Sequence, residues 1–595
     1  MNMKNLKTRW TDQVLENPTT VLNEYPRPTM VRKSYINLNG LWDYAITQTK
    51  DMPQNYDGKI LVPFSPESYL SGVERQLQPT EYLWYRRTLP KQVAISENCK
   101  RWILHFGAVD QIATVYLNGV VLIRHTGGYL PFSVDVTEVL DPDNENELIV
   151  RVQDVSDTSY HSRGKQKLTC GGMYYTAQSG IWQTVWMEEV PENYITGLEI
   201  NTNYDQKNID IVVLSNTTNE IMIEIPGKLK IKALSNEKQK LEIPQMHSWS
   251  PEDPFLYKLK ITLGEDEVES YFAMRKISVE KDENRIPRVF LNNKPYFQKG
   301  LLDQGYWPDG LYTAPTDEAM IFDISEMKRL GFNMLRKHCK IEPERWYYHC
   351  DRMGMLVWQD MINGGSSYKD WYVTYLATVL AHTPWKPKDK NYYLLSRASD
   401  EGKKEFEQEV KDTISRLKNH PSIVTWTIFN EGWGQFDAER ITKDVKEMDS
   451  SRLIDHASGW FDQGTGDYQS IHEYFLPLKF KQESKRVTAL TEYGGYSWHV
   501  PLHSACEAEY GYKKFEDRKS LSEGYERLIR ADILPNVKKG LSATIYTQVS
   551  DIEEETNGIY TYDREVLKIS EEVLKRCNKE IDTEFYEVVF KDSTI

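Results

Sequence analysis

Residues 422–432, SIVTWTIFNEG, form an apolar run that ends in Asn430 and Glu431 and breaks at a glycine. Residues 490–494, LTEYG, repeat this arrangement around Glu492. Both runs predict β-strands, because strands that are buried on both faces are apolar along their length. A carboxylate at the end of a buried strand is costly unless other groups compensate its charge. The two runs therefore predict a site that holds a pair of carboxylates.

The sequence around these two runs alternates between strand patterns and helix patterns. Thr316 is a plausible helix N-cap, and the apolar spacing that follows it stops before Gly331. Strands are predicted at residues 332–336, 355–360 and 422–429 and at runs ending at Asp455, His472, Glu492 and Gln548, and helices at 344–353 and 406–418. About eight such units in one region predict a (β/α)₈ TIM barrel, which we place at residues 279–595.

The preceding half of the chain is rich in short strands. Residues 112–117 run into Asn118-Gly119, a strong signal for a type I′ hairpin. Strands at this spacing predict a β-sandwich for residues 1–190. Residues 191–278 continue with alternating strands and have the length of one immunoglobulin-like β-sandwich. The chain is therefore expected to be multidomain, with two β-domains before the barrel.

Composition excludes several classes of partner. The formal net charge is −15, which disfavours nucleic acid and anionic membranes as partners. The first residues are polar, and no apolar run is long enough to span a bilayer. The six cysteines are far apart in the sequence, which favours free thiols in a reducing compartment. We therefore expect a cytoplasmic protein that binds neither nucleic acid nor a membrane.

Polar residues stand at the predicted strand ends of the barrel. The C-terminal strand ends of such a barrel meet on one face, which carries the active site. These residues are Asp303, Arg336, His338, Asp360, Asn430, Glu431, His472, Glu492 and Gln548. Some of them are expected to be scaffold, and Arg336 paired with a neighbouring carboxylate is the main example.

Glu431 and Glu492 are the candidates for cleavage of a glycosidic bond. Hydrolysis through a covalent intermediate needs two carboxyl groups about 5–5.5 Å apart, one ionised and one protonated. Like charges at this distance push the two pKa values apart, and this separation assigns the roles. Asn430 could hydrogen-bond the 2-hydroxyl of the sugar, and Tyr493 could donate to the nucleophile.

A metal-dependent site is the weaker interpretation. His338, Cys339, His349, Cys350 and Asp351 are ligand types, but their spacing matches no zinc signature and no H-E-x-x-H motif occurs. Phosphate-binding loops and G-x-S-x-G nucleophile elbows are also absent from the sequence. We expect no required cofactor and no catalytic metal; a structural Mg²⁺ or Na⁺ leaves little spacing signal and is left open.

Short motifs along nearly the whole chain carry a family resemblance. They are Asn39-Gly40-Leu41-Trp42, Gly127-Gly128-Tyr129, Ser179-Gly180-Ile181-Trp182, Phe272-Ala273-Met274-Arg275, His420-Pro421 with Asn430-Glu431, Thr491-Glu492-Tyr493-Gly494 and Asn557-Gly558-Ile559-Tyr560. Together they resemble glycoside hydrolase family 2, which includes β-galactosidases, β-glucuronidases and β-mannosidases. The segment 272–275 departs from the family pattern, because Ala273 stands in place of a glycine.

The resemblance implies a fold, a mechanism and a set of site residues. Residues 1–190 would be a jelly-roll sugar-binding domain, and an exo-acting, retaining enzyme would remove one terminal sugar from an oligosaccharide or glycoside. Glu431 would be the acid/base and Glu492 the nucleophile. The expected substrate-binding residues are Asn430, Tyr493, His338, Arg336, Asp360, His472, Asp303, Tyr546 and Gln548.

Departures from the family pattern bear on the sugar. β-Glucuronidases of the family carry an Asn-x-Lys pair that binds the uronate carboxylate, whereas this chain has Glu555-Thr556-Asn557-Gly558. Trp358-Gln359-Asp360 is similar to the β-mannosidase version of its strand, and Tyr546 stands where many members have tryptophan. β-Galactosidase-like specificity is the default expectation. β-Mannosidase, α-L-arabinofuranosidase, β-galactofuranosidase and the disfavoured β-glucuronidase specificity are alternatives.

Other functional classes are also left open by the sequence. A carbohydrate-binding protein without activity would keep the fold and lose the chemistry, although both glutamates are present. A transglycosylase would use the same residues with a sugar as acceptor. An unrelated barrel enzyme would depend on a metal and lose activity on chelation. A homodimer is common for proteins of this size class.

Overall fold

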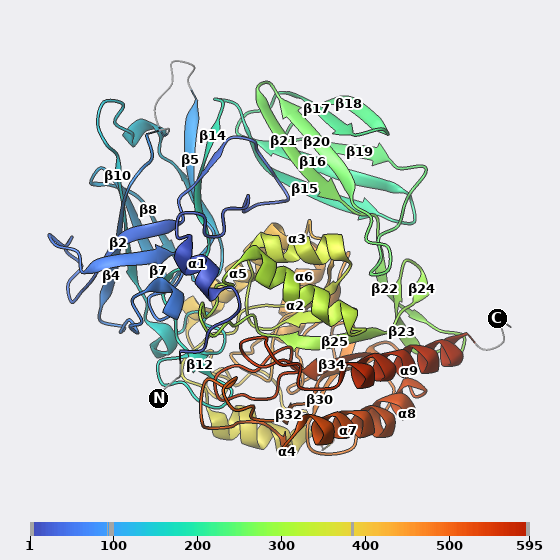
Figure 1. Ribbon diagram of the computed structural model, residues 1–595. Coiled ribbons are helices and arrows are strands. Elements are labelled where there is room, and N and C mark those ends of the chain that lie inside the picture. Colours follow the sequence, from blue (N-terminus) through green and yellow to red (C-terminus); the bar gives the residue numbers. More distant parts are fainter. Residues whose placement is uncertain (1–4, 92, 94–99, 382, 384–385, 591–595) are drawn as a thin grey trace.

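The computed structural model describes residues 5–91, 93, 100–381, 383 and 386–590. Two β-sandwiches lie over a barrel surrounded by helices (Figure 1). The N-terminal domain lies to the left in this view, the second sandwich at the upper right and the barrel below both. This arrangement confirms the predicted fold class of two β-domains and one TIM barrel.

The N-terminal domain consists of two facing antiparallel sheets around a core that includes Trp42, Leu104 and Val150. The first sheet contains β1 (Tyr35–Asn37), β14 (Val185–Val190), β5 (Arg101–Phe106) and β9 (Phe132–Asp135). The second sheet contains β3 (Gly58–Val62), β2 (Gly40–Thr47), β4 (Tyr82–Thr88), β10 (Glu147–Gln153), β7 (Ile112–Leu117) and β8 (Val120–Thr126). The hairpin predicted between β7 and β8 is confirmed, with φ of +51° at Asn118 and +79° at Gly119.

The second sandwich has one sheet of three strands and one of four. The first contains β15 (Ile195–Asn203), β16 (Asn208–Ser215) and β19 (Lys238–Glu242). The second contains β18 (Leu229–Leu234), β17 (Glu220–Ile225), β20 (Tyr257–Leu263) and β21 (Asp266–Phe272). The strands alternate buried and exposed positions, as β20 does from Tyr257 to Leu263, because one face of each sheet packs on the shared core.

The barrel sheet has eight parallel strands. In sheet order they are β29 (Leu453–Asp455), β28 (Ile423–Thr427), β27 (Leu356–Asp360), β26 (Met334–Lys337), β25 (Gln298–Asp303), β34 (Leu541–Thr547), β31 (Val487–Gly494) and β30 (Tyr468–Glu473). A small sheet of β22 (Ile277–Lys281), β23 (Pro287–Leu291) and β24 (Lys294–Pro295) contributes Ile277, Val289 and Leu291 to the core of the barrel.

Helices cover the outside of the barrel, but they do not follow every strand. The main helices are α2 (Asp317–Arg329), α3 (Glu344–Met353), α5 (Asp400–Leu417), α6 (Ala438–Met448), α7 (Arg518–Leu528) and α9 (Glu571–Val589). Thr316 caps α2 as predicted, by accepting from the Ala319 amide. Helix α5 begins earlier than expected, because Ser399 caps it and accepts from the Gly402 amide. In the described chain, β29 and β30 are followed by loops instead of the helices that the sequence pattern predicted.

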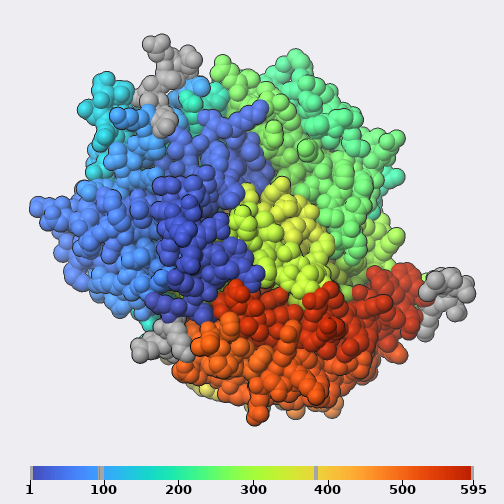
Figure 2. Space-filling model, viewed as in Figure 1, coloured from blue at the N-terminus to red at the C-terminus, as the bar shows by residue number. Residues whose placement is uncertain are grey.

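The segment before β1 connects all three domains. Thr8 and Thr11 each donate a hydrogen bond of 2.6 Å to Asp309 beside the barrel. Arg32 forms a bidentate ion pair with Asp266 of the second sandwich, at 2.8 Å for both contacts. Figure 2 shows this dark blue segment running over the surface between the N-terminal domain and the barrel. The polar contacts hold the domains in one arrangement.

A loop of the N-terminal domain, residues 160–178, reaches the mouth of the barrel. The amides of Arg163 and Gly164 donate to the carbonyl of Asn363, which follows β27, at 3.0 and 3.1 Å. The Thr176 amide donates to Glu553 at 2.9 Å, beyond β34. The N-terminal domain therefore contributes directly to the face on which the barrel strands end.

The cysteines and the helices bear on two predictions, namely free thiols and the lack of a membrane-spanning segment. Cys170, Cys339, Cys350 and Cys577 are free thiols, whereas Cys99 lies outside the described residues. In the part of the chain that is described, none of the helices is both long and apolar enough to span a bilayer.

Candidate active site

Glu431 and Glu492 lie together at the C-terminal face of the barrel. Glu431 follows β28 and has a left-handed backbone with φ of +51°, and Glu492 lies near the end of β31. One carboxylate oxygen of each, together with a ring nitrogen of His472, lie within 4.8 Å of one another. Retaining glycosidases place their carboxyl groups about 5–5.5 Å apart and inverting ones about 6.5–9.5 Å, and this close approach of one oxygen from each carboxylate favours the retaining arrangement.

His472, at the end of β30, stands between the two glutamates. Its Nδ1 lies 2.9 Å from Oε1 of Glu431, and its Nε2 lies 3.6 Å from Oε1 of Glu492. Ser458 Oγ is 2.9 Å from the same Nε2 and fixes the orientation of the ring. One imidazole thus contacts both carboxylates.

Arg336, at the end of β26, joins most of the predicted site residues. The guanidinium contacts both oxygens of Asp360 at 3.0 Å and donates to Oε1 of Glu492 at 3.1 Å. It also donates to Oδ1 of Asn430 at 2.8 Å. Arg336 is fully buried, and the predicted pairing with a neighbouring carboxylate is confirmed. One cation therefore sets the positions of Asn430 and Glu492.

The surroundings of Glu492 keep it ionised. Burial by itself would raise the pKa of Glu492, but the charges of His472 and Arg336 outweigh burial and hold the pKa at about 2. Tyr474 donates a hydrogen bond of 2.6 Å to Oε2 of the same carboxylate and stacks on Tyr512, with ring centroids 3.7 Å apart. Glu431 has a single ion pair among the described residues, with His472. The two carboxyl groups therefore have different environments, as a nucleophile and an acid/base require.

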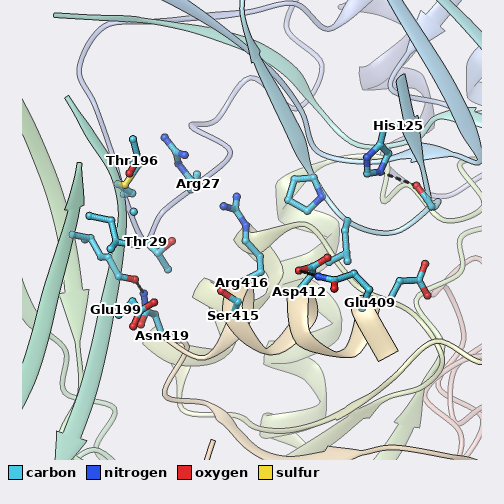
Figure 3. A pocket seen from close by; sticks show the side chains of 18 of the residues that line it. Arg27, Thr29, His125, Thr196, Glu199, Glu409, Asp412, Ser415, Arg416 and Asn419 are labelled. Atoms are coloured by element: carbon cyan, nitrogen blue, oxygen red, sulfur yellow. Dashed lines mark hydrogen bonds between the residues drawn. The ribbon is translucent and has the colours of Figure 1, made fainter. Parts of the chain in front are cut away.

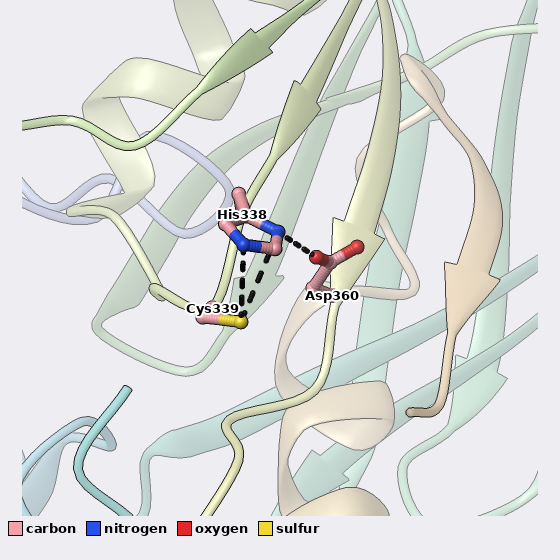
Figure 4. Close-up of side chains that lie close together, drawn as sticks. All are labelled: His338, Cys339 and Asp360. Atoms are coloured by element: carbon pink, nitrogen blue, oxygen red, sulfur yellow. Dashed lines mark hydrogen bonds and ion pairs between the residues drawn. The ribbon is translucent and has the colours of Figure 1, made fainter. Parts of the chain in front are cut away.

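His338 lies beside the same cluster and is held by Asp360 (Figure 4). Its Nδ1 is 2.7 Å from Oδ2 of Asp360, and Cys339 Sγ lies 3.7 Å from its Nε2. Burial and the nearby charge of Lys165 lower the pKa of His338 to about 4. The imidazole is therefore neutral at physiological pH and available as a hydrogen-bonding group.

Two groups of side chains in the described residues could each offer three ligand atoms to a metal ion. They are His338, Cys339 and Asp360, and Glu431, His472 and Glu492. In the first group both oxygens of Asp360 are already bound by Arg336. In the second group Arg336 is in contact with Glu492. A bound guanidinium opposes a second cation at the same oxygens.

Tyr493 and Tyr546 do not face the site, contrary to the expectation that both bind substrate. Their rings pack together, with centroids 5.5 Å apart, in the apolar layer between the barrel and the helices. Neighbouring residues of a strand point to opposite faces, so Tyr493 points away when Glu492 points inward. Tyr474, and not Tyr493, donates to the nucleophile candidate.

Asp303 is also placed differently from the expectation. Its carboxylate pairs with Lys337 at 2.8 Å and accepts from the Gly305 amide at 2.9 Å. Lys337 lies over the ring of Trp346 in α3. Asp303 is thus part of a buried ion pair behind the strands, and substrate binding by this residue is not supported.

Gln548 follows β34, the neighbour of the strand that carries Glu492, and belongs to a second polar network. It accepts from Gln304 at 2.7 Å and donates to Asn557 at 2.8 Å. Asn557 donates to Glu555 at 3.0 Å, and Tyr175 of the N-terminal domain also donates to Glu555. Glu555 and Asn557, in the stretch that matches the Asn-x-Lys pair of β-glucuronidases, therefore bind each other and a tyrosine.

The described residues leave several buried donors of the site without partners. They are Nδ2 of Asn430, Nε1 of Trp433 and the hydroxyl of Tyr174. Unpaired buried donors are costly, and they are expected to bind an oxygen-rich ligand. Oδ1 of Asn430 is bound by Arg336, so its amide nitrogen is presented to the ligand.

Two residues of the site were missed in the sequence. Tyr474 lies in the loop after β30, and Lys165 lies in the loop of the N-terminal domain that reaches the barrel. The Lys165 ammonium is 5.7 Å from the ring centroid of Trp433 and 5.8 Å from that of Tyr175. No single-sequence pattern marks either residue, because both positions depend on contacts between distant segments.

A separate cavity of about 540 Å³ lies where the three domains meet (Figure 3). Arg27, His125 and Thr196 lie along one side of it and Glu409, Asp412 and Arg416 of α5 along the other. It is lined by neither Glu431 nor Glu492. We therefore assign the candidate active site to the barrel mouth and not to this larger space.

Three family models match consecutive parts of the chain. Residues 63–181 match "Glycosyl hydrolase 2 galactose-binding domain-like", residues 189–275 match "Glycosyl hydrolases family 2", and residues 287–511 match "Glycosyl hydrolases family 2, TIM barrel domain". They correspond to the two sandwiches and to most of the barrel.

Curated relatives are distant in sequence. A beta-glucuronidase of Streptococcus agalactiae is 23% identical over 435 residues, 68% of this chain and 68% of its own length. A beta-galactosidase of Lactococcus lactis is 22% identical over 525 residues, 81% of this chain and 47% of its own length. A Formosa agariphila relative is 25% identical over 477 residues, 71% of this chain and 51% of its own length. The chain thus spans about half to two thirds of the curated relatives it matches.

Solved structures share the whole architecture. A beta-glucuronidase of an uncultured Clostridium species matches with a TM-score of 0.71 at 19% identity, over 92% of this chain and 99% of its own. A GH2 beta-galacturonidase from Eisenbergiella tayi matches with a TM-score of 0.69 at 18% identity, over 93% and 99%. These likenesses confirm the fold, and the three family models place the sequence. The chain belongs to glycoside hydrolase family 2.

Proposed function

We propose that this protein is a retaining exo-glycosidase in which Glu492 is the nucleophile and Glu431 the acid/base. The observation that carries the proposal is the carboxylate pair within 4.8 Å, with His472 between its members. The low pKa of Glu492, which the charges of His472 and Arg336 cause against the effect of burial, supports its role as the ionised partner.

In the first step, Glu492 attacks the anomeric carbon and forms a glycosyl ester. The bond to the leaving oxygen breaks, and Glu431 gives its proton to that oxygen. Arg336 and Tyr474, which contact Glu492 at 3.1 and 2.6 Å, hold the attacking carboxylate in place. Asn430 Nδ2 is free to donate to the 2-hydroxyl as charge develops in the transition state.

In the second step, water replaces the enzyme at the anomeric carbon. Glu431, now ionised, takes a proton from the water, and the ester bond to Glu492 breaks. Two displacements return the anomeric configuration to that of the substrate. His472 contacts both carboxylates and is suited to adjust to the change of charge in each step.

Exo-action is supported by the loop at residues 160–178. It is hydrogen-bonded to the barrel beyond β27 and beyond β34, so it crosses the face where the strands end. A mouth that is covered in this way accommodates the end of a glycan more readily than its interior.

The proposed specificity depends mainly on the group that the terminal sugar carries at C6. The relatives are named as beta-glucuronidase, beta-galactosidase and beta-galacturonidase, whose sugars carry a carboxylate or a hydroxymethyl group there. The sequence pattern favoured β-galactosidase-like specificity and disfavoured a uronide, because the expected lysine is missing. Most of these relatives favour a uronide, so β-glucuronide or β-galacturonide is the leading candidate and β-galactoside the second.

The test is hydrolysis of p-nitrophenyl glycosides together with trapping of the intermediate. An activated 2-deoxy-2-fluoro glycoside should label wild-type protein, and peptide mass spectrometry should find the sugar on Glu492. Glu492→Gln should abolish turnover with an unchanged melting temperature. Glu431→Ala should slow release of the sugar by about 10²–10⁴-fold, and azide should restore turnover by giving a glycosyl azide of retained configuration. Normal turnover by Glu492→Gln would refute the proposal.

A further inference from the structure

Lys165 is a buried cation without an anionic partner. Lys165 is only 7% exposed to solvent. No hydrogen bond or ion pair joins its ammonium to any residue that the structure describes, and it lies within 6 Å of the ring centroids of Trp433 and Tyr175. A buried charge in this state is unfavourable unless a ligand or water compensates it. The other buried lysines of the region, Lys337 and Lys340, both pair with Glu342.

The loop that carries Lys165 is built to approach the barrel closely. Gly164 has φ of +62°, and a Cβ at this position would lie 2.7 Å from the Cys339 carbonyl and 2.9 Å from the Tyr312 hydroxyl. The side-chain amide of Asn363 also donates to the Gly164 carbonyl at 3.0 Å. The backbone next to Lys165 is therefore fixed against the residues that follow β26 and β27.

The ammonium lies near residues of the candidate active site. Trp433 is two residues beyond Glu431, and Tyr175 donates to Glu555, which lies beyond β34. The charge of Lys165 is near enough to contribute to lowering the pKa of both Glu492 and His338. When the anomeric carbon of a sugar faces Glu492, we expect another substituent of the same ring to lie near this ammonium.

The other charges of the mouth do not supply what an anionic sugar needs. Arg336 is occupied by Asp360, Glu492 and Asn430. Glu555 would repel a carboxylate at the wall where β-glucuronidases of the family carry their Asn-x-Lys pair. Of these basic residues, Lys165 alone is buried at the mouth and has an ammonium without an anionic partner among the described residues.

We infer that Lys165, from the N-terminal domain, binds the carboxylate of a terminal uronic acid and makes this protein a β-uronide hydrolase. This inference rests on the proposed retaining glycosidase function and names its substrate class. The ammonium would form a charge-assisted hydrogen bond with the C6 carboxylate in a site with restricted access to water. Trp433 and Tyr175 would remain as the aromatic walls on either side of the ion pair.

The test compares two pairs of p-nitrophenyl substrates that differ only at C6: β-glucuronide with β-glucoside, and β-galacturonide with β-galactoside. Wild-type protein should prefer a uronide to its neutral counterpart. Lys165→Met, which keeps most of the volume, should lower kcat/KM for the uronide by about 100-fold and change the neutral substrate less than about 3-fold. Lys165→Arg should recover part of the preference.

Lys167→Met is the matched control. Lys167 lies two residues further along the same loop, with its ammonium 3.5 Å from the ring centroid of Tyr174, and it is not among the charges that act most on Glu492. Its removal should leave the preference between uronide and neutral sugar unchanged. Melting temperatures of all variants show that the comparison concerns folded protein.

Three outcomes would overturn the inference while leaving the glycosidase proposal intact. They are a wild-type preference for neutral sugars, an equal loss on both members of a pair in Lys165→Met, and an unchanged preference in that variant. Equal loss would mean that Lys165 acts on Glu492 and not on the substrate. If no substrate is cleaved, the glycosidase proposal fails, and calorimetry with free glucuronate, galacturonate, glucose and galactose decides the inference. Binding of a uronate that Lys165→Met abolishes supports the carboxylate-binding role of Lys165, and no preference for uronates overturns it.

Discussion

The Nδ1 atom of His472 lies 2.9 Å from Oε1 of Glu431, so the proposed acid/base, which follows β28, is held by a side chain from β30, the strand that pairs with the strand of Glu492. The other nitrogen of the same ring is 3.6 Å from Glu492. This single imidazole links the residue that must release a proton to the residue that must stay without one.

The environment of Glu492 leads to a prediction for the pH dependence of activity. The nucleophile acts in its ionised form, and the charges of His472 and Arg336 hold the pKa of Glu492 at about 2 against burial, below the ordinary value for glutamate. Activity is therefore retained as pH falls until Glu492 or His338, with a pKa of about 4, takes up a proton. We expect the acid limb of kcat/KM to lie at about pH 4 or below in rapid assays.

His472→Gln should move this acid limb to higher pH, because a neutral amide no longer lowers the pKa of Glu492. Initial rates in short incubations, with recovery of activity at neutral pH as the control for unfolding, measure the limb. A wild-type limb at about pH 5 or above would contradict the assignment of Glu492 as the strongly stabilised anion.

Tyr474 gives a second prediction, about the orientation of the nucleophile. Its hydroxyl donates to Oε2 of Glu492 at 2.6 Å, so Tyr474→Phe should lower kcat by about 10–100-fold while the ring stays stacked on Tyr512. Tyr493→Phe is the matched control, because its ring packs against Tyr546 behind the strand. Steady-state kinetics of the two variants decide the point, and a larger loss in Tyr493→Phe would reverse the assignment.

The sequence predicted the barrel and most of its central cluster for a clear physical reason. Residues at the C-terminal ends of parallel strands converge, so the order of strands along the chain is enough to group Arg336, His338, Asp360, Glu431, His472 and Glu492. All of them lie in one network of hydrogen bonds and ion pairs.

The other features of the site could not be predicted from the residues at the strand ends. Tyr493 is an exception, because alternation along β31 already directs it away from the face that carries Glu492. Tyr474 comes from a loop where a helix was expected, and Lys165 comes from another domain. Contacts between segments so far apart leave no periodic pattern in a single sequence.

The third prediction concerns metals. Arg336 binds both oxygens of Asp360 and one oxygen of Glu492, so the two clusters with metal-ligand side chains already contain a compensating cation. We expect hydrolysis to continue at an unchanged rate after dialysis against EDTA. Loss of activity that Mg²⁺ restores would contradict this and would identify Glu431, His472 and Glu492 as the ligand set to be tested by substitution.

The fourth prediction concerns the loop that joins the N-terminal domain to the barrel mouth. Gly164 and Gly172 both lie in this loop with positive φ, +62° and +61°, so an alanine meets the same left-handed backbone cost of about 1–2 kcal/mol at each. A Cβ at Gly164 would also lie 2.7 Å from the Cys339 carbonyl, whereas at Gly172 the nearest atom, in the ring of Tyr510, is 3.7 Å away.

Gly164→Ala should therefore push the loop off the barrel and carry Lys165 with it, whereas Gly172→Ala should change only local stability. We expect kcat/KM to fall at least about 10-fold further in Gly164→Ala than in Gly172→Ala when melting temperatures of both are compared. Equal effects of the two substitutions would mean that only backbone strain matters and that close contact with Cys339 is not needed. A larger effect at Gly164, confined to substrates that Lys165 recognises, would show that the two domains form one binding site.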